Sequence, residues 1–253
     1  MIQPEIHLPT LPAEFPGFIE ATFGPMRTDR RERVYQGLYI LATSGLSLGI
    51  ELRTVMGACI GLSPENGSLF RVFLEELPNL GLAIKSTPVY LGHSRLALLR
   101  LSELGRRYAR ALGWEPVQNE WEQLIERHSG LRYPRHTVGL LAFAMHARLR
   151  DWQVELLPEV NRYVKPDARV WRAGEPPVYV EFECRIRVRG YKWQKLARAR
   201  KRVALATFNP NVRAGLVEEA KKVAPQGLAV DLVTLTSQGK GHGLGPLWVE
   251  SWG

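Results

Sequence analysis

The chain has 253 residues, enough for one large domain or two ordinary ones, and its content of 45% apolar and 23% charged residues is typical of a soluble globular protein. Its net charge of +9 indicates an anionic partner, with nucleic acid the first expectation and an acidic membrane surface the second. The two cysteines, Cys59 and Cys184, lie in apolar segments, which favours reduced buried thiols over a disulfide framework. Because neither a signal peptide nor an apolar run of membrane-spanning length is visible, we expect a cytoplasmic location and no membrane partner.

The first half of the chain alternates turn residues with helical periods. Residues 1–25 contain five prolines and no sustained period, which predicts an extended arm. Helices are expected over residues 28–44, 49–56 and 64–78, the third capped by Ser63. Two β-like runs, 82–91 and 95–101, follow, and Ser102 then caps a helix that Gly113 ends.

Three helices, a hairpin and a closing helix form the order of a winged helix-turn-helix. Residues 95–113, RLALLRLSELGRRYARALG, resemble the wing strand and closing helix of many bacterial winged-helix DNA-binding domains. In that fold the third helix lies in the major groove and the hairpin touches the backbone. The resemblance implies groove contacts from Asn66, Ser68 and Arg71. The basic side chains that argue for DNA on the hairpin and closing helix are Lys85, Arg95, Arg106, Arg107 and Arg110.

The acidic side chains of the third helix leave an alternative open. Glu65, Glu75 and Glu76 lie on or beside that helix and would repel phosphates. A winged helix that dimerises or docks a protein partner is therefore the alternative to a DNA reader.

The second half follows a connector, residues 114–135, with the domain boundary near Gly113. An apolar helix over 137–150 precedes strands at 154–160, after Asp167 and at 178–184. A basic helix over 191–202, a strand at 203–208, a helix over 212–223 and a strand at 228–235 complete the body. This order predicts an α/β layer with a central mixed sheet over residues 136–253, joined to a winged helix over 26–113, so that the whole chain is α+β. The glycine-rich stretch 237–246 lacks the context of a phosphate-binding loop and is expected to be a flexible connection.

Three acidic residues are candidates for chemistry. Strand alternation in VYVEFEC places Glu181 and Glu183 on one face, and Asp167, just before the preceding strand, is positioned to join them across the sheet. Clustered carboxylates repel one another and are tolerated mainly beside a divalent cation or basic groups. The alternative is an exposed sheet face whose acids pair with neighbouring arginines.

Pro166-Asp167 followed by Glu181-Phe182-Glu183 resembles the signature of the PD-(D/E)XK nuclease superfamily, with Glu183 where most members have lysine. From about Arg27 the chain resembles the replication-relaxation family of plasmid and phage proteins, in which an acidic pair on the third strand precedes a basic helix with a Lys-Leu step, here Lys195-Leu196. The resemblance implies that Asp167 and Glu181 hold Mg²⁺ or Mn²⁺, and that Glu183 orients or deprotonates the attacking water.

The same resemblance implies that Lys192 or Lys195 supplies the charge of the missing lysine. Many superfamily members also carry an acid on the first helix. Here that helix has none, and Glu155 or Glu159 is the candidate replacement.

A basic block carries the expectation of DNA binding. No acidic residue occurs between Cys184 and Val217, whereas a solvated face usually mixes signs, so a polyanionic partner is expected. Tyr191 and Trp193 are candidates for base stacking or for core and rim positions. His146 is expected to be a core side chain and His136 a helix-start residue. The expected DNA contacts are Arg185, Arg187, Arg189, Lys192, Lys195, Arg198 and Arg202, with Arg71, Lys85 and Arg95 in the first half.

The sequence therefore predicts a Mg²⁺-dependent DNA endonuclease serving plasmid, phage or mobile-element replication. The rival is a non-catalytic replication initiator or transcription regulator, and the third alternative is a winged-helix interaction adaptor. DNA is the expected partner, a homodimer is compatible with the winged helix, and no organic cofactor is expected.

Overall fold

The computed structural model describes residues 6–91, 94–128, 134–159, 165–186, 190–200, 202–238 and 244–253. The chain divides into two compact units: Gln3–Val89 with Arg95–His128, and Ser129–Gly253 with Tyr90–Ser94 and Met1–Ile2. The division between residues 128 and 129 falls within the stretch expected to be a connector. None of the described helices is both long and apolar enough to cross a lipid bilayer.

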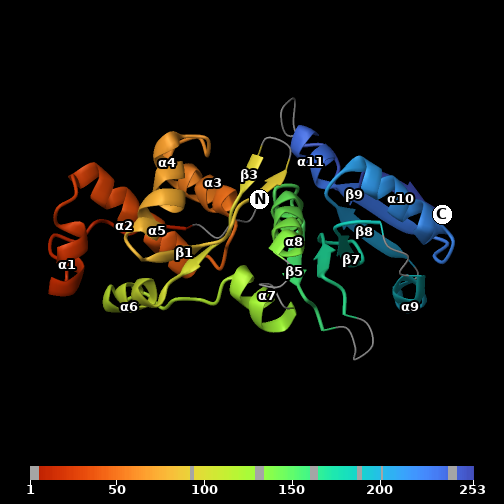
Figure 1. The fold of residues 1–253 in the computed structure, drawn as a ribbon, viewed down its shortest axis with the longest axis horizontal. Coiled ribbons are helices and arrows are strands. Elements are labelled where there is room, and N and C mark those ends of the chain that lie inside the picture. The colour runs from red at the N-terminus through yellow and green to blue at the C-terminus, as the bar shows by residue number, and fades with distance from the viewer. Residues whose placement is uncertain are drawn as a thin grey trace. The chain divides into compact units, whose positions relative to one another are not determined.

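The unit that holds the N-terminal half is mainly helical (Figure 1). Its helices are α1 Gly17–Phe23, α2 Thr28–Thr43, α3 Gly49–Ile60, α4 Gly67–Arg71, α5 Leu77–Asn79, α6 Glu103–Ala111 and α7 Glu120–His128, and a π-helical turn, Val72–Glu76, joins α4 to α5. Strands β1 Ala83–Lys85 and β4 Leu99–Leu101 pair antiparallel in this unit. Strand β2 Val89–Leu91 pairs with β3 Ser94–Leu96, and residues Tyr90–Ser94 of this pair belong to the other unit.

Two expectations for this unit were wrong. The proline-rich arm contains helix α1, because Phe15, Ile19 and Phe23 recur at the helical spacing of four and are buried, with the rings of Phe15 and Phe23 stacked 5.1 Å apart. The helix predicted over residues 64–78 begins as α4 at Gly67 rather than at Pro64. The side chain of Asn66 accepts the N–H of Ser68 and so caps the start of α4. The predicted cap at Ser102 is confirmed, since its hydroxyl accepts the N–H of Gly105 at 2.9 Å.

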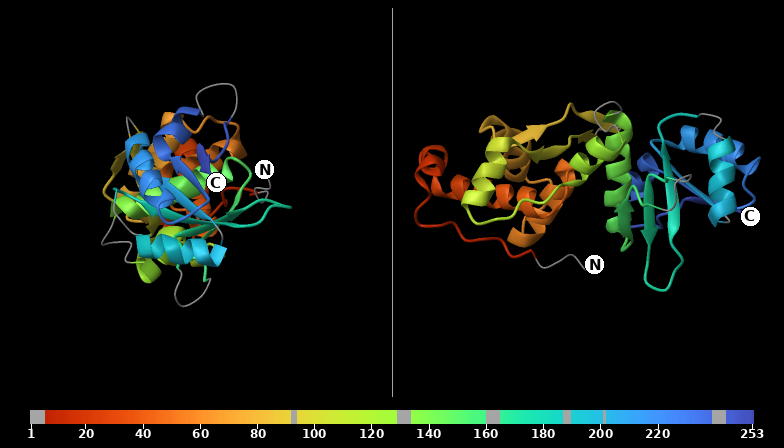
Figure 2. Two further views of the ribbon diagram at one scale, coloured as in Figure 1. Left: turned by 90° about the vertical axis from the view of Figure 1, so that its right-hand side faces the viewer. Right: turned by 90° about the horizontal axis from the view of Figure 1, so that it is seen from below.

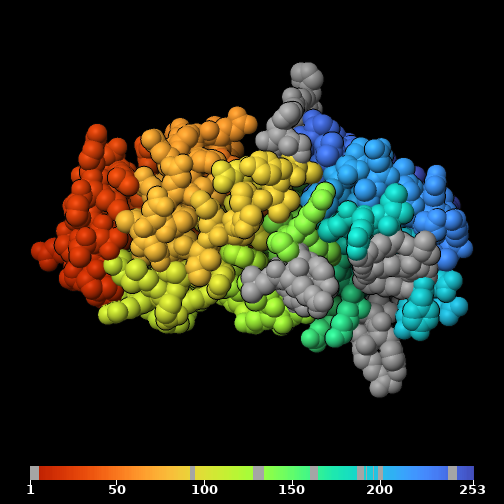
Figure 3. Space-filling model, in the orientation of Figure 1, coloured from red at the N-terminus to blue at the C-terminus, as the bar shows by residue number. Residues whose placement is uncertain are grey.

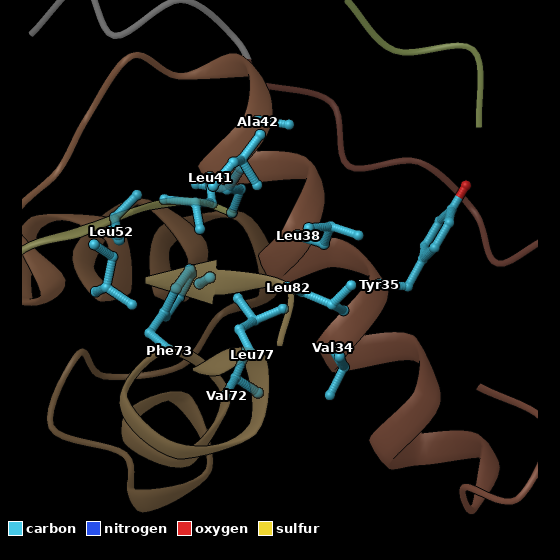
Figure 4. Close-up of a cluster of buried hydrophobic side chains, with 14 of the residues drawn as sticks. Val34, Tyr35, Leu38, Leu41, Ala42, Leu52, Val72, Phe73, Leu77 and Leu82 are labelled. Atoms are coloured by element: carbon cyan, nitrogen blue, oxygen red, sulfur yellow. The ribbon is translucent and has the colours of Figure 1, made fainter. Parts of the chain in front are cut away.

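One apolar core organises the unit (Figure 4). Side chains from α2 converge with those of α3, the π-helical turn and the segment before β1. Leu38, Leu52, Phe73 and Leu77 are completely buried. Burial of this kind, at about 1.5–3 kcal/mol for each large side chain, is what holds these short helices in place.

The other unit is a mixed α/β structure with a six-stranded mixed sheet. The sheet order is β5–β6–β7–β8–β9–β10: β5, β6 and β7 are antiparallel neighbours, β7, β8 and β9 run parallel, and β10 is antiparallel to β9. The strands are β5 Gln153–Leu156, β6 Ala168–Trp171, β7 Val178–Glu183, β8 Val203–Thr207, β9 Gly227–Asp231 and β10 Glu250–Trp252. The helices are α8 Pro134–Arg148, α9 Gly190–Arg200, α10 Pro210–Lys221 and α11 Leu232–Gln238.

Helices cover both faces of this sheet (Figure 2). Helix α8 lies on the face of Phe182, where a Cβ on Gly139 would come within 2.3 Å of the ring, so that only glycine permits this approach. On the opposite face, Trp193 of α9 and Leu216 of α10 pack with Tyr179 and Leu205 of the sheet. Strand alternation in β7 therefore turns Glu181 and Glu183 toward the face of α9 and α10.

Two predicted elements end earlier than expected. The strand predicted to reach residue 235 ends at Asp231, whose carboxylate accepts the N–H of Thr234 at 2.8 Å and so favours the start of α11. The basic helix ends at Arg200, so Arg202 lies in a bend before β8 instead of on α9.

Candidate functional site

Three buried acidic residues lie on neighbouring strands where β6 begins and β7 ends. The register pairs Ala168 with Val180, so Asp167, one residue earlier, lies beside Glu181. The carboxylate Oδ2 of Asp167 accepts the backbone N–H of Phe182 at 2.8 Å, between the two glutamates. Asp167, Glu181 and Glu183 are only 2%, 1% and 5% exposed. The register therefore places Asp167 next to Glu181, and the alternative of an exposed acidic face is wrong because all three residues are buried.

His136 is a member of this cluster that the sequence did not indicate. It lies in the first turn of α8, its Nε2 is 3.3 Å from Oδ2 of Asp167, and its ring stands edge-on to Phe182 at 5.8 Å. The apolar pattern of α8 predicted a helix but not which strand its first turn meets. The imidazole of His136, on α8, therefore contacts Asp167, the residue just before β6.

The carboxyl ends of the parallel strands add further polar groups. The register aligns Glu183 with Thr207 and Thr207 with Asp231. The hydroxyl of Thr207 donates to the backbone carbonyl of Glu183 at 2.6 Å, and Arg213 Nη1 lies 2.5 Å from Asp231 Oδ2. The Arg213 guanidinium thus balances the charge of Asp231 within the fold. The carboxyl ends of the strands are where open α/β sheets commonly bind ligands.

The cysteine beside the acids is not a reactive group. The pKa of the Cys184 thiol is raised to about 11, mainly by burial. The charge of Arg135, and less that of Arg185, opposes this shift, while the carboxylates of Glu183 and Asp167 add to it. A thiol with this pKa is protonated at neutral pH and is therefore a poor nucleophile and metal ligand.

The oxygen donors fit Mg²⁺ in kind but are already engaged. Within the described ranges, no three His, Cys, Asp or Glu side chains converge as metal ligands. Glu181 and Glu183 each take part in further interactions. Mg²⁺ in proteins keeps several waters and is commonly held by one or two carboxylates with substrate phosphates, and Asp167 and Glu181 are two carboxylates of this kind. The alternative acid Glu155 forms an ion pair with Arg169, its cross-strand partner, at 2.5 Å.

The basic residues of the same unit surround α9, part of which is visible in cyan in Figure 3. Arg185 and Arg198 are exposed, and Arg202 is half-buried. Lys195 is half-buried, and its Nζ lies 4.3 Å from the centroid of the Tyr191 ring. Arg187, Arg189 and the side chain of Lys192 lie outside the described residues. Trp193 is completely buried, so it is a core residue and not a stacking surface.

In the first unit, Lys85 is used within the fold. Pro78 has no N–H for the carbonyl of Leu74, one helical turn earlier, and Lys85 Nζ donates to that carbonyl at 2.5 Å. This hydrogen bond positions the Lys85 ammonium, and the residue remains exposed to solvent.

Some of the other predicted DNA contacts of this unit also have partners within the fold. Arg106 forms an ion pair with Glu122, the guanidinium of Arg107 lies 4.8 Å from the ring centroid of Phe18, and Asn66 is occupied as a cap. The predicted basic contacts of this unit that are exposed to solvent are Arg71, Lys85, Arg95, Arg107 and Arg110.

Comparison of the chain with protein-family models, with curated proteins and with solved structures gave no match. The resemblance to winged-helix and PD-(D/E)XK proteins therefore stays a prediction from the sequence.

Proposed function

We propose that the chain is a DNA-binding protein whose α/β unit hydrolyses phosphodiester bonds with Mg²⁺ or Mn²⁺, in the replication of a plasmid, phage or other mobile element. The observation that carries the proposal is the position of Asp167 next to Glu181 across the β6–β7 pair, with the Asp167 carboxylate hydrogen-bonded to the Phe182 N–H. The element order α8, β5, β6, β7, α9, β8 supports it, because the resemblance to PD-(D/E)XK nucleases implies a helix, three strands, a helix and a further strand in this order.

The chemistry assigned to these residues follows from their types. Hydrolysis adds water to phosphorus and breaks one P–O ester bond, so the site must polarise the phosphate and take a proton from the water. Asp167 and Glu181 would hold the cation, which supplies the polarisation. Glu183 is the carboxylate proposed to accept the proton, and Lys195 on α9 is the cation proposed to offset charge on the phosphate.

The test of the enzyme is metal-dependent nicking of supercoiled plasmid DNA. We expect nicking to require Mg²⁺ or Mn²⁺ and to fall about 100-fold or more in Asp167→Asn and in Glu181→Gln, because each loses a charge that holds the cation. The matched control is Glu175→Gln, at an exposed acid in the turn between β6 and β7, which should nick as the wild type does. Undiminished nicking by either site variant would remove the site from the proposal.

A non-catalytic replication initiator or transcription regulator is the second candidate. It is favoured by Glu183 in the place of the usual lysine and by the engagement of Asp167 with His136 and the Phe182 N–H. Under this alternative the full chain binds duplex DNA, Asp167→Asn binds it equally well or better because a negative charge is gone, and no metal supports nicking.

DNA binding itself is tested by its dependence on salt. We expect the triple change of Lys195, Arg198 and Arg202 to alanine to reduce the slope of log affinity against log salt concentration by about 2 to 3, since each lost phosphate contact removes about 0.9. The control is Lys221→Ala with Lys222→Ala at the end of α10, where both lysines already pair with glutamates. Equal slopes for the wild type and the triple variant would place the contacts elsewhere.

A further inference from the structure

Tyr191 is a large aromatic side chain that the fold leaves in solvent. It is the second residue of α9, and 73% of it is exposed. Trp193, two positions later, is completely buried against Leu205 and Leu216. Because successive helical residues are about 100° apart, anchoring Trp193 in the core turns Tyr191 and Lys195 to the opposite side of α9.

Lys195 gives the exposed ring a defined neighbour. It lies one helical turn after Tyr191, and its Nζ is 4.3 Å from the ring centroid. One face of the ring therefore carries a cation, while most of the side chain remains open to solvent. An aromatic surface and an ammonium group are thus held together within one side-chain pair.

We propose that Tyr191 is the stacking surface for an unpaired base of DNA and that Lys195 holds the phosphate beside that base. The inference rests on the proposed DNA-binding function and names its substrate class as DNA with a single-stranded segment. In a blunt duplex the base faces are covered by neighbouring bases, so an exposed tyrosine on a helix finds a stacking partner only where a base is unpaired.

The positive charge of the segment that contains Tyr191 favours single-stranded DNA over a protein as its partner. Between Cys184 and Val217 the sequence contains no acidic residue, and Arg185 and Arg198 near or on α9 are exposed. A docking surface for an ordinary protein mixes signs, whereas a cationic groove with aromatic side chains is the arrangement that binds single strands regardless of base sequence.

The experiment compares three fluorescently labelled DNA probes of one sequence with the full-length chain: a single strand, a blunt duplex, and a duplex with a single-stranded overhang. We expect Tyr191→Ala to weaken binding of the single strand and the overhang probe about 5- to 100-fold, the range typical of a lost base–aromatic stack. Binding of the blunt duplex should change by less than about 2-fold, because no phosphate contact is lost. Tyr191→Phe should retain the wild-type affinities, since it keeps the ring.

A second readout reports the stack directly. With 2-aminopurine in the overhang, binding by the wild type and by Tyr191→Phe should quench its fluorescence, and binding by Tyr191→Ala at saturating protein should not. For Lys195→Ala we expect the salt slope on the single strand to fall by about 0.7, the value of one phosphate contact, with quenching retained.

The outcomes separate this inference from the function on which it rests. If the wild type binds duplex DNA with a steep salt dependence but Tyr191→Ala matches it on every probe, the stacking assignment is wrong and the DNA-binding proposal stands. Equal weakening on all three probes would likewise overturn the assignment, because it would show a general loss of affinity. If the wild type binds no probe at low salt, the proposed function fails and the inference fails with it.

Discussion

Replacement of Arg150 by methionine is expected to lower the free energy of unfolding of the α/β unit by about 3–5 kcal/mol. The guanidinium is buried, and it donates to the carbonyls of Gly245, His146 and Leu235 at 2.9, 3.0 and 3.2 Å. Methionine fills a similar volume but donates nothing, so three carbonyls lose their donor at once. Urea unfolding followed by circular dichroism measures the change.

The control for Arg150 is Lys222→Met, which removes a cation from an exposed ion pair with Glu219 and should cost less than about 1 kcal/mol. Arg150→Lys should fall between the two, because an ammonium group keeps the charge but cannot donate in three fixed directions. A loss below about 1 kcal/mol in Arg150→Met would show that water replaces these hydrogen bonds and that the arginine does not join α8 to α11.

Protonation of His146 is expected to lower the free energy of unfolding by about 3 kcal/mol as the pH falls from about 6.5 to about 4. Burial, and then the nearby charge of Arg150, lowers the pKa of His146 from its ordinary 6.5 to about 4. The hydrogen bonds give the reason: Thr236 donates to the Leu232 carbonyl, so its hydroxyl accepts from His146 Nε2, while Nδ1 accepts from Arg150 Nη1 at 3.3 Å. A proton on Nδ1 would break the bond to Arg150 and place two positive charges together.

The direction of this effect follows from proton linkage. Between pH 4 and 6.5 the unfolded chain binds a proton at His146 that the folded chain does not, so stability rises with pH across this range and is fully present above about 6.5. The difference between the two pKa values, at about 1.4 kcal/mol for each pH unit, gives the figure of about 3 kcal/mol.

His146→Gln isolates this contribution, because glutamine offers both an N–H and an oxygen but does not titrate. Unfolding free energies of the wild type and the variant should differ by an amount that changes by about 3 kcal/mol between pH 7 and pH 4. A constant difference across this range would mean that His146 is protonated in the folded protein.

Local patterns account for much of the fold. The spacing of apolar residues predicted α2 and α8, the hydroxyl of Ser102 predicted the start of α6, and strand alternation placed Glu181 and Glu183 on one face. His146 was predicted to be a core side chain, and its buried hydrogen bonds confirm this. These features depend on residues a few positions apart, where the period of the helix or strand determines the outcome.

The failures have a common physical origin in partners that are distant in sequence. Helix α1 forms because Phe15 and Phe23 pack into a core built by later helices. The Lys85 ammonium is held by the carbonyl of Leu74, eleven residues earlier, which lacks its usual helical donor because residue 78 is proline. At the candidate site, the meeting of Asp167 with Glu181 followed from a hairpin, whereas the contact of His136 with Asp167 spans 31 residues and has no local signal.

Strand β7 is where the antiparallel half of the sheet changes to the parallel half. Strand β6 is antiparallel to β7, so the start of β6, with Asp167 just before it, lies beside the C-terminal end of β7. Strand β8 is parallel to β7, so its C-terminal end, with Thr207, lies at the same end of the sheet. The loop that joins β6 to β7, residues 172–177, therefore lies at the far end of the hairpin. Its length can drift through insertions without moving the acids, which makes it a suitable point of attachment for a spectroscopic label.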